Sequence, residues 1–323
     1  MKELLLFMTD FYGYNKNIIS EIKNHGFNVT WFLDEIKRTQ FERIIAKIYP
    51  KYIEKKFDLY FDSCLEQVKE KKFDEILIIF GAVFIKKKHI EKIRKTFPNT
   101  KIVYYAWDSV DNFPLIKDLL TDCDISYTFD HEDAEKYNVE LLPLFYCDDN
   151  NKYISSTPKY DASTVMSFFW EKFYSLKSVL DAIPQNLNNK IYLRIRDKLY
   201  YYRLKILKGK KIKEIEKYFE YKSLDRESVY KIFGESKAVI DCPLPRQRGL
   251  TMRTFEVLAL KRKLITTNKN IVNYDFYCPE NVYIVNGDNN CDFMEFINSE
   301  FNNDYVLSEK YSLSKFVDKL ILK

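Results

Sequence analysis

The residues RQRGLTMRTFEVLALKRKLITTNKNI, numbered 246–271, contain the local pattern that decides the fold. An apolar strand pattern, KAVIDC (237–242), comes just before them, and a second strand pattern, KLITT (263–267), lies inside them. Between the two strands, residues 251–260 have the spacing of a helix, which begins at Thr251, a residue type favoured at helix N-caps. A strand, a helix and a strand in this order are typical of a βαβ unit. The stretch therefore predicts a parallel sheet covered by helices.

The same alternation runs along the rest of the chain. Strand patterns occupy residues 3–8, 27–33, 75–80, 101–107, 124–130, 139–145, 163–170 and 281–285. Helical patterns occupy residues 15–26, 35–70 (broken at Pro50), 86–97, 113–123, 131–138, 171–183, 226–236, 292–301 and 312–323. Strands that alternate with helices in this way predict an α/β protein with parallel sheets and helices on both faces.

The length of 323 residues favours two domains, at roughly 100–200 residues per domain. The polar stretch DDNNKYISSTPKY (148–160) contains Pro158 and has the composition of a linker. We therefore expect a first Rossmann-like domain over residues 1–150 and a second over residues 160–310.

The composition excludes several classes of protein. Hydrophobic residues make up 46% and charged residues 31%, as in ordinary soluble domains. The sequence contains neither GxGxxG nor GxxxxGK[ST], so a dinucleotide cofactor or a P-loop has no motif support. No stretch approaches 18 apolar residues, and the six cysteines form no CxxC pair. We expect a cytoplasmic protein with reduced thiols.

The positive charge is concentrated in one segment. Residues 190–217 hold eleven Lys/Arg and three Asp/Glu, which is +8, so the remaining chain carries −3 of the net +5. Ile191, Ile195, Leu199, Tyr202 and Ile206 have the spacing of one helix face, which predicts a basic amphipathic helix. Such a helix can lie on an anionic membrane surface; contact with another polyanion, or a solvated basic face on a core helix, are the alternatives. No nucleic-acid-binding module accompanies the charge.

Polar side chains follow several strands, and ligands of doubly wound sheets bind at the carboxyl ends of the strands. Asp108 follows the strand at 101–107 and is our first candidate for a general base on an acceptor hydroxyl. His131 follows the strand at 124–130 and is the second candidate. Helix capping is the alternative role for both segments. Two such domains are expected to face a cleft, which we expect to be lined by Asp10, Tyr12, Gly13 and Asp241.

The residues around Gly249 have the pattern of a diphosphate site. Gly249 permits a turn, and the helix that follows presents its N-terminal N–H groups and positive dipole end. Arg253 lies in the first turn, and Glu256, three residues on, lies on the same helix face, where its carboxylate can accept both hydroxyls of a ribose. Arg246 and Arg248 precede the helix. A capped helix with surface arginines is the alternative. No His, Cys, Asp or Glu cluster has metal-ligand spacing, so we expect neither a metal nor another cofactor.

The segment RTFEVLALKRKLITTN resembles the donor-binding helix and following strand of GT-B glycosyltransferases. It is most similar to the bacterial enzymes of lipopolysaccharide O-antigen and capsule synthesis, in which an Arg-x-x-Glu helix leads into a Leu-Ile-Thr-Thr-Asn strand. The similarity of residues covers about 236–285, including SKAVIDC and YDFYCPENVYIV, and the similarity of shape covers most of the chain. It implies two Rossmann-like doubly wound domains facing a cleft, with a terminal helix at 311–323 that crosses back onto the first domain.

The resemblance also implies roles for individual residues. Glu256 would hold the donor ribose, and Arg253 would hold the diphosphate together with the backbone of Gly249, Leu250 and Thr251. Many retaining members have a second Glu eight residues before the ribose Glu, but this chain has Arg248 there, which favours an inverting mechanism. An inverting enzyme needs one base, for which Asp108 and then His131 are the candidates. Arg248 would balance the charge of the departing nucleotide without a metal.

The expected function is therefore a glycosyltransferase that moves a sugar from a nucleotide-sugar to a lipid-linked saccharide in bacterial surface polysaccharide synthesis. It would work at the inner face of the cytoplasmic membrane, held there by the basic segment, and would not bind nucleic acid. One alternative is a non-catalytic protein with a transferase fold that binds a saccharide or a nucleotide. Another is a related enzyme that uses a nucleotide-activated polyol or acid sugar.

Overall fold

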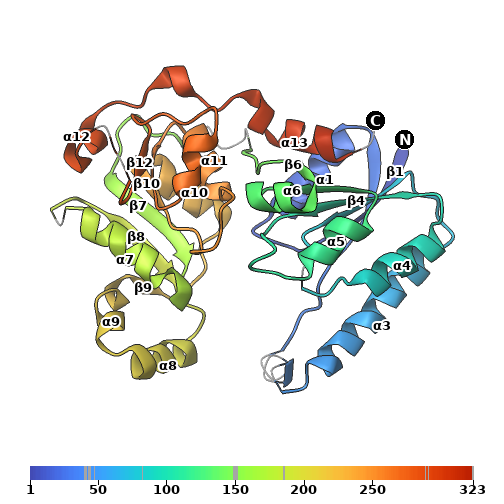
Figure 1. Cartoon of the computed structure of the whole chain (residues 1–323). Helices are drawn as coiled ribbons and strands as arrows, with labels where there is room; N and C mark the ends of the chain where they lie inside the picture. The colour runs from blue at the N-terminus through green and yellow to red at the C-terminus, as the bar shows by residue number, and fades with distance from the viewer. Residues whose placement is uncertain are drawn as a thin grey trace. The chain divides into compact units, whose positions relative to one another are not determined.

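The computed structural model describes residues 1–39, 42, 45–46, 48–81, 83–147, 152–184, 186–287, 289 and 291–321. The chain divides into two compact units, Met1–Pro143 with Leu313–Lys323, and Leu144–Ser312 (Figure 1). We call them unit 1 and unit 2. Each contains a six-stranded sheet and its own hydrophobic core. All the paired strands are parallel, which confirms the prediction of two Rossmann-like α/β halves.

Unit 1 has the strand order β2-β1-β3-β4-β5-β6. Its strands are β1 (Lys2–Met8), β2 (Phe27–Phe32), β3 (Glu75–Ile79), β4 (Lys101–Ala106), β5 (Ile125–Thr128) and β6 (Glu140–Leu141). Its helices before the linker are α1 (Tyr14–Asn24), α3 (Pro50–Val68), α4 (Lys87–Thr96), α5 (Ile116–Asp122) and α6 (His131–Tyr137). The strand order reverses at β1 and β3, so the carboxyl ends of these strands mark the crevice where doubly wound sheets bind ligands.

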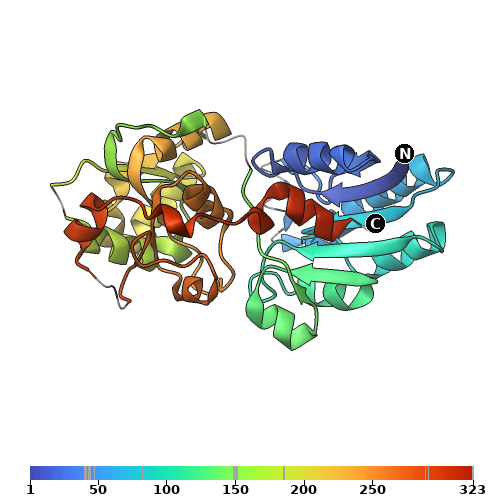
Figure 2. The ribbon, with the colours of Figure 1, turned by 90° about the horizontal axis from the view of Figure 1, so that it is seen from above.

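The helices of unit 1 cover both faces of its sheet (Figures 1 and 2). Helices α3, α4 and α5 pack on one face, in a core that includes Phe57, Phe61 and Ile93. Helix α1 and the terminal helix α13 (Leu313–Leu320) pack on the other face. Helix α3 begins at Pro50, a residue tolerated in the first turn because its missing N–H has no helical partner there. The helical pattern expected before Pro50 is wrong for residues 35–39, which form no helix, and residues 40, 41, 43, 44 and 47 lie outside the described residues.

The terminal helix α13 belongs to unit 1 although it follows unit 2 in the chain. Its buried side chains have the spacing i, i+3, i+4 and i+7, and include Phe316, whose ring lies 4.8 Å from that of Tyr105. Polar contacts hold its exposed side: His25 Nε2 lies 2.9 Å from Asp318 Oδ1. His25 thus connects the C-terminal end of α1 to α13.

Unit 2 has the strand order β12-β11-β10-β7-β8-β9. Its strands are β7 (Tyr160–Ser167), β8 (Lys190–Arg194), β9 (Phe219–Glu220), β10 (Ser236–Asp241), β11 (Lys263–Thr266) and β12 (Val282–Ile284). Its α-helices are α7 (Phe173–Ala182), α8 (Lys198–Lys208), α9 (Lys210–Lys213), α10 (Arg226–Gly234), α11 (Met252–Ala259) and α12 (Phe293–Asn298). This is the strand order of a dinucleotide-binding Rossmann sheet, with its switch point between β7 and β10.

The basic segment 190–217 is not one amphipathic helix, and that prediction was wrong. Residues 190–194 form β8, in which Ile191 and Leu193 are buried, and Ile195 follows the strand. The helix begins only at Lys198, where Asp197 caps it by accepting a hydrogen bond from the Tyr200 amide. The spacing of four between Ile191 and Ile195 suits a helix, but alternate β-branched and aromatic residues also suit a strand, and the sheet selects the strand.

Candidate functional site

The carboxyl end of β10 lies at the switch point of unit 2 and ends in a buried carboxylate. Asp241 is only 1% exposed. Its Oδ2 accepts hydrogen bonds from the hydroxyls of Thr251, at 2.7 Å, and Thr254, at 3.3 Å. Its Oδ1 lies 3.2 Å from Arg253 Nη1. A buried charge is tolerated when hydrogen bonds and an opposite charge satisfy it, and Asp241 has both.

Arg253 connects the two strands on either side of the switch point. Besides its contact with Asp241 at the end of β10, its Nη2 donates to the Val165 carbonyl in β7 at 2.6 Å. Its side chain is 19% exposed. The sequence prediction gave Arg253 a diphosphate, whereas the structure also gives it two protein partners. It therefore has a positioning role at this edge of the sheet, and its contact with a diphosphate stays a prediction.

The N-terminus of α11 lies beside this ion pair. Thr251 occupies the N-cap position predicted from the sequence, with φ −79° and ψ 163°, but its hydroxyl bonds Asp241 instead of the helix backbone. The Thr251 side chain therefore makes no capping hydrogen bond to α11, and the Thr254 amide donates to the Thr251 carbonyl at 3.1 Å. The N-terminus of α11 and the positive end of its dipole lie at the carboxyl edge of the sheet, an arrangement suited to an anion.

Two asparagines after β11 hold the loop that leads into α11. Asn268 Nδ2 donates to the carbonyls of Arg248, at 3.1 Å, and Gly249, at 3.3 Å. Asn270 Nδ2 donates to the same Arg248 carbonyl at 3.1 Å. The carbonyls of Arg248 and Gly249 therefore accept hydrogen bonds from side-chain amides that follow β11. The Arg246 side chain is exposed, and that of Arg248 is half-buried. Sequence reasoning missed both asparagines, although Asn268 ends the Thr-Thr-Asn signal that was noted.

Glu256 lies on the same helix as Arg253 and is buried, at 7% exposed. The Tyr230 hydroxyl on α10 donates a short hydrogen bond to Glu256 Oε1. Arg226 stacks over the Tyr230 ring, with Cζ 5.0 Å from the ring centroid, and its Nη2 lies 3.4 Å from the hydroxyl. Burial, followed by the charge of Glu256, raises the pKa of Tyr230, so its hydroxyl remains a donor. Tyr230 and Arg226 were not predicted, because no spacing connects α10 to α11.

In unit 1 a tight turn follows β1 at the switch point. The Tyr14 amide donates to the Phe11 carbonyl at 3.0 Å, and the two residues between them, Tyr12 and Gly13, have φ of 48° and 80°. Two positive φ angles define a type I′ turn, which favours Gly at the second position. Phe11 and Tyr12 are 45% and 55% exposed. Asp10, Tyr12 and Gly13, predicted to line a cleft, thus lie at the carboxyl end of β1.

The loop after β4 reaches this turn and also reaches α6. The Trp107 ring lies 5.9 Å from that of Tyr14, which connects the ends of β4 and β1. Asp108 Oδ1 accepts hydrogen bonds from the Ser109 amide and from Asn112 Nδ2, both at 2.8 Å. These two hydrogen bonds are those of a turn-forming residue. Its role as a base stays a prediction.

His131 begins α6, whose cap is Asp130, as the capping alternative anticipated. The Val110 amide donates to Asp133 Oδ2 at 2.8 Å, which brings the loop of Asp108 and the start of α6 together. The pKa of Asp133 is raised to about 6: burial raises it most, the Val110 hydrogen bond lowers it, and the charges of Asp130 and Asp111 raise it. Sequence reasoning missed Asp133, which lies two residues after His131 and accepts a hydrogen bond from the loop of Asp108.

The structure therefore sorts the predicted site residues into two sets. Asp10, Tyr12, Gly13, Asp108 and His131 lie at the carboxyl edge of the unit 1 sheet, and Asp241, Arg246, Arg248, Gly249, Leu250, Thr251, Arg253 and Glu256 lie at or beside that of the unit 2 sheet. Within the described part of the chain, no three His, Cys, Asp or Glu side chains are grouped to hold a metal ion. Nor does that part contain a helix long and apolar enough to cross a membrane.

No family model matches the sequence, and no curated protein matches it. Solved structures do match the fold. Sucrose-phosphate synthase from Thermosynechococcus elongatus superposes with a TM-score of 0.59 at 11% identity, over 99% of this chain and 95% of that one. Anabaena HepE in complex with UDP-glucose gives 0.60 at 9% identity, over 99% and 98% of the chains. The Methanocaldococcus jannaschii UDP-GlcNAc 2-epimerase, in complex with UDP-GlcNAc and UDP, gives 0.55 at 11% identity, over 99% of each.

These likenesses concern the fold alone. Together with the two parallel sheets, they identify two Rossmann-like domains of the GT-B fold. The fold class predicted from the alternation of strands and helices is thereby confirmed. The same fold is found in glycosyltransferases and in epimerases that use nucleotide-sugars.

Proposed function

We propose that this protein is a glycosyltransferase that binds a nucleotide-sugar donor through unit 2 and an acceptor through unit 1. The observation that carries the proposal is the position of α11. Its N-terminus lies at the switch point between β7 and β10, and it presents Arg253 and Glu256 three residues apart. This is the place where a doubly wound sheet binds a nucleotide.

The donor's diphosphate would lie against the first turn of α11, with the exposed Arg246 and the half-buried Arg248 as counter-charges. Arg253, bonded to Asp241 and Val165, would complete the site from the sheet side. Glu256 would accept the ribose hydroxyls, and the Tyr230 hydroxyl would keep its carboxylate in place. HepE was captured with UDP-glucose and with UDP, which supports a uridine diphosphate sugar as the first donor to test.

The chemical step would be an inverting displacement at the anomeric carbon, with one base in unit 1. Asp108 is the first candidate, and His131 the second. Asp133 accepts a hydrogen bond from the Val110 amide in the loop of Asp108 and lies two residues after His131 in α6, and its pKa of about 6 suits proton transfer near neutral pH. The cationic side chains and the dipole of α11 would balance the charge of the departing nucleotide, so the proposed reaction uses no metal or other cofactor.

The acceptor would be a saccharide, and in the finer form of the proposal a lipid-linked saccharide of a bacterial surface polysaccharide. Two features support a saccharide in unit 1. Phe11 and Tyr12 are exposed aromatic side chains at the switch point, and their rings lie 4.6 Å apart. Tyr14 and Trp107 continue this aromatic group. Rings with one exposed face provide flat apolar surface, and the nearby carboxyls provide hydrogen-bond acceptors for hydroxyl groups.

A nucleotide-sugar epimerase is the second candidate, because the GT-B fold of this chain is shared with UDP-GlcNAc 2-epimerases. An epimerase would convert its donor without an acceptor. A non-catalytic binding protein would convert nothing. The protein can be incubated with the nucleotide-sugar that it binds, first alone and then together with a saccharide acceptor. The products distinguish a glycosyltransferase, an epimerase and a non-catalytic binding protein.

The first test is thermal unfolding of the wild type and of Glu256→Gln with UDP, GDP, CMP, ADP and dTDP. A ligand at 100 times its dissociation constant stabilises its binding protein by about 2.7 kcal/mol. We expect one nucleotide to stabilise the wild type and to stabilise Glu256→Gln much less. Tyr230→Phe keeps the carboxylate but removes its donor, and should show an intermediate shift. If no nucleotide stabilises the wild type, or if Glu256→Gln responds fully, the proposed donor site is wrong.

A further inference from the structure

We propose that α8 and α9 of unit 2 form a docking surface for an anionic lipid bilayer. This inference deepens the proposed function, since it gives the enzyme a place of attachment, but vesicle binding is measured without donor or turnover. Its failure is therefore distinguishable from failure of the glycosyltransferase proposal. The surface, which we call the α8–α9 face, consists of residues 198–213 and two neighbouring aromatic side chains, Trp170 and Tyr174.

The first observation is an apolar stripe that faces solvent. In α8, Leu199 is 79% exposed, Tyr202 59% and Ile206 83%. They are three and four residues apart, so they lie on one side of the helix. The sequence had placed these three residues on one helix face, which the structure confirms, but that face points outward. Leu207, beside Ile206, is 60% exposed. A core face exists separately, around the buried Leu204.

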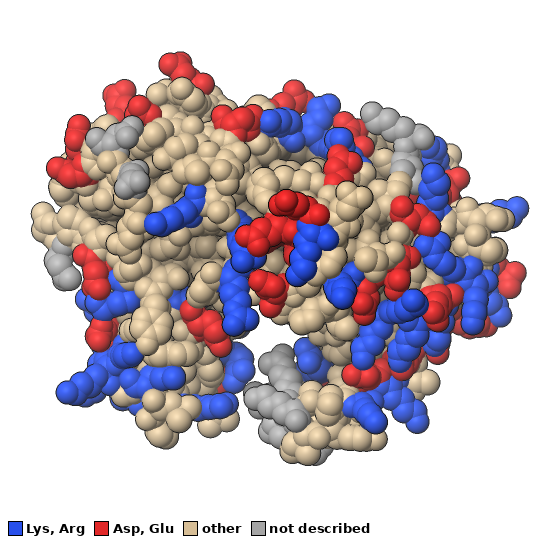
Figure 3. All heavy atoms as spheres, viewed as in Figure 1, with Lys and Arg blue, Asp and Glu red and all other residues tan. Residues whose placement is uncertain are grey.

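The second observation is the charge around this stripe. Residues 198–213 contain seven Lys/Arg and no Asp/Glu. In Figure 3, Lys and Arg gather at the end of unit 2 where α8 and α9 lie, next to uncharged surface. Some of these cations have local partners, such as Lys205 with Glu216 at 3.4 Å. Lys198, Arg203, Lys210 and Lys213 are exposed.

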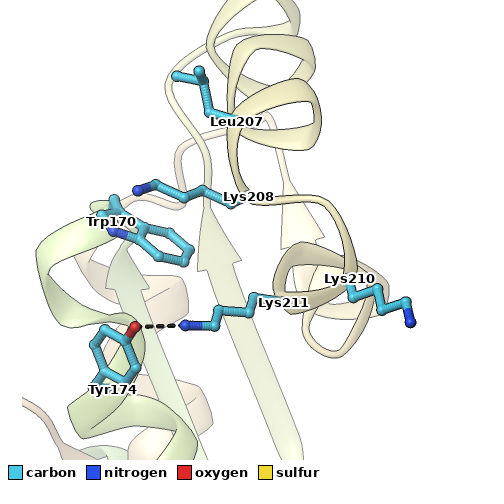
Figure 4. Close-up of a pocket in the computed structure, with 6 residues that line it drawn as sticks. All are labelled: Trp170, Tyr174, Leu207, Lys208, Lys210 and Lys211. Carbon is cyan, nitrogen blue, oxygen red and sulfur yellow. Dashed lines mark hydrogen bonds between the residues drawn. The ribbon is translucent and has the colours of Figure 1, made fainter.

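The third observation is a cationic and aromatic pocket between the α8–α9 segment and two aromatic rings (Figure 4). It has a volume of about 450 Å³. Lys208 Nζ lies 4.6 Å from the centroid of the Trp170 ring, and Lys211 Nζ lies 2.6 Å from the Tyr174 hydroxyl. Leu207 and Lys210 complete the lining. Trp and Tyr rings with lysine stems are the groups that prefer the level of lipid headgroups, apolar at one end and polar at the other.

A bilayer fits these three observations together better than the other occupants do. A nucleic acid or a soluble polyanion would use the cations, but it gives no reason for exposed Leu199 and Ile206 side chains. A second copy of the chain would cover the stripe, but it would bring seven cations against seven with no acidic residue in the segment to pair them. An interfacial helix needs both features, with apolar side chains entering the acyl boundary and cations at the anionic headgroups.

The experiment is flotation of the full-length protein with large vesicles of phosphatidylcholine alone, or with 30 mol% phosphatidylglycerol as a chosen probe. We expect the bound fraction to be at least tenfold higher on the anionic vesicles and to fall with added salt. The double variant Leu199→Ser/Ile206→Ser should lose at least tenfold in the partition coefficient. Its matched control, Leu59→Ser/Val272→Ser, alters side chains that are 63% and 49% exposed elsewhere, and should bind like the wild type.

Charge reversal tests the electrostatic half of the proposal. Lys210→Glu/Lys213→Glu should abolish the preference for phosphatidylglycerol, whereas Lys51→Glu/Lys55→Glu on α3 should preserve it. Equal binding of both vesicle types by the wild type, or full binding by Leu199→Ser/Ile206→Ser, would overturn the proposal. The proposal would also be wrong if the protein bound heparin but not vesicles, and the same variants weakened the binding to heparin. It would be wrong, too, if the wild type formed a concentration-dependent dimer that Leu199→Ser/Ile206→Ser converted to monomer.

Discussion

At the scale of single residues, the buried carboxyl of Asp34 shows how a position in the fold changes the chemistry of a side chain. Asp34 follows β2 and is 2% exposed. Its Oδ2 accepts a hydrogen bond from the Gly81 amide, at 2.7 Å, after β3. Burial raises the pKa of Asp34 from 3.8 to about 7; the Gly81 bond lowers it, and the charge of Glu35 raises it. Near pH 6 this carboxyl is therefore protonated in the folded protein, whereas the same carboxyl is ionised in the unfolded chain.

We expect Asp34 to make unit 1 less stable as the pH rises. Between pH 4 and 7 the folded carboxyl retains a proton that the unfolded chain has released, so the free energy of unfolding falls with rising pH. At about 1.4 kcal/mol per pKa unit, the loss is up to roughly 4 kcal/mol. Urea unfolding at pH 4.5, 6 and 8 measures it. Asp34→Asn should weaken this pH dependence and leave the smaller part that Asp133 contributes, whereas the exposed Asp304→Asn should preserve it in full. A pH dependence in Asp34→Asn equal to that of the wild type would contradict the assignment.

The sequence predicted which residues of the candidate site lie on the same element, but it did not predict their partners. Spacing placed Arg253 and Glu256 on one helix, and both lie on α11. It did not reveal that Tyr230, 26 residues earlier, donates to Glu256. Nor did it reveal that Arg253 donates to the Val165 carbonyl, 88 residues away. Such contacts depend on which strands are neighbours in the sheet, and no local pattern contains that information.

At the scale of elements, the polar contacts of Arg253 connect α11, β10 and β7 at the switch point. Asp241 ends β10 and is bonded by two threonine hydroxyls besides Arg253. The strand pairing itself is modest there, because the β7–β10 register runs only as far as Val239 opposite Ser163. The side-chain contacts extend the connection of the two strands toward their carboxyl ends, where the proposed donor site lies.

We therefore expect Arg253→Ala to destabilise unit 2 even without a ligand. Removal of one partner from a buried ion pair costs about 3–5 kcal/mol, because the other charge remains buried. The 19% exposure of the Arg253 side chain should place the loss near the lower end of that range. Urea unfolding is the measurement. Arg246→Ala, which alters an exposed arginine of the same loop, is the matched control and should change stability by less than about 0.5 kcal/mol.

A double-mutant cycle then separates the pair from its surroundings. Asp241→Asn alone should also destabilise, and the two changes together should cost less than their sum, by roughly 1–3 kcal/mol. If Arg253→Ala unfolds like the wild type but no longer responds to nucleotide, Arg253 is a ligand-binding residue alone, and the positioning role is wrong.

Sequence reasoning identified best the elements whose apolar residues have the spacing of only one type of secondary structure. Helix α11 and strands β10 and β11 lie within one or two residues of their predicted bounds. Strands β8 and β9 were missed because they lie inside or beside the basic segment, where lysines and arginines suggested one long helix. Strand β9 has only two residues, too few for any periodicity. Their place in the sheet is set by pairing with β7 and with each other.

At the scale of the whole molecule, the two units have separate cores, and each unit contains at least one tryptophan that can report its unfolding. The chain contains three Trp residues, of which Trp31 and Trp107 belong to unit 1 and Trp170 to unit 2. Alternation of strands and helices sufficed to predict two such halves. It did not reveal their different strand orders, because order within a sheet is a tertiary property. The two orders place one switch point in each unit.

A nucleotide that binds at α11 should stabilise unit 2 and leave unit 1 unchanged, and the tryptophans can report each unit separately. In Trp31→Phe/Trp107→Phe, fluorescence reports unit 2 through Trp170; in Trp170→Phe it reports unit 1. With the nucleotide at 100 times its dissociation constant, the first variant should gain about 2.7 kcal/mol in the unfolding free energy that Trp170 reports. The second should gain nothing in the unit 1 signal. The reverse pattern would place the nucleotide at the β1–β3 switch point of unit 1, and Glu256 would then have no role in donor binding. Equal gains in both would mean that the units unfold as one, and the assignment would then depend on Glu256→Gln alone.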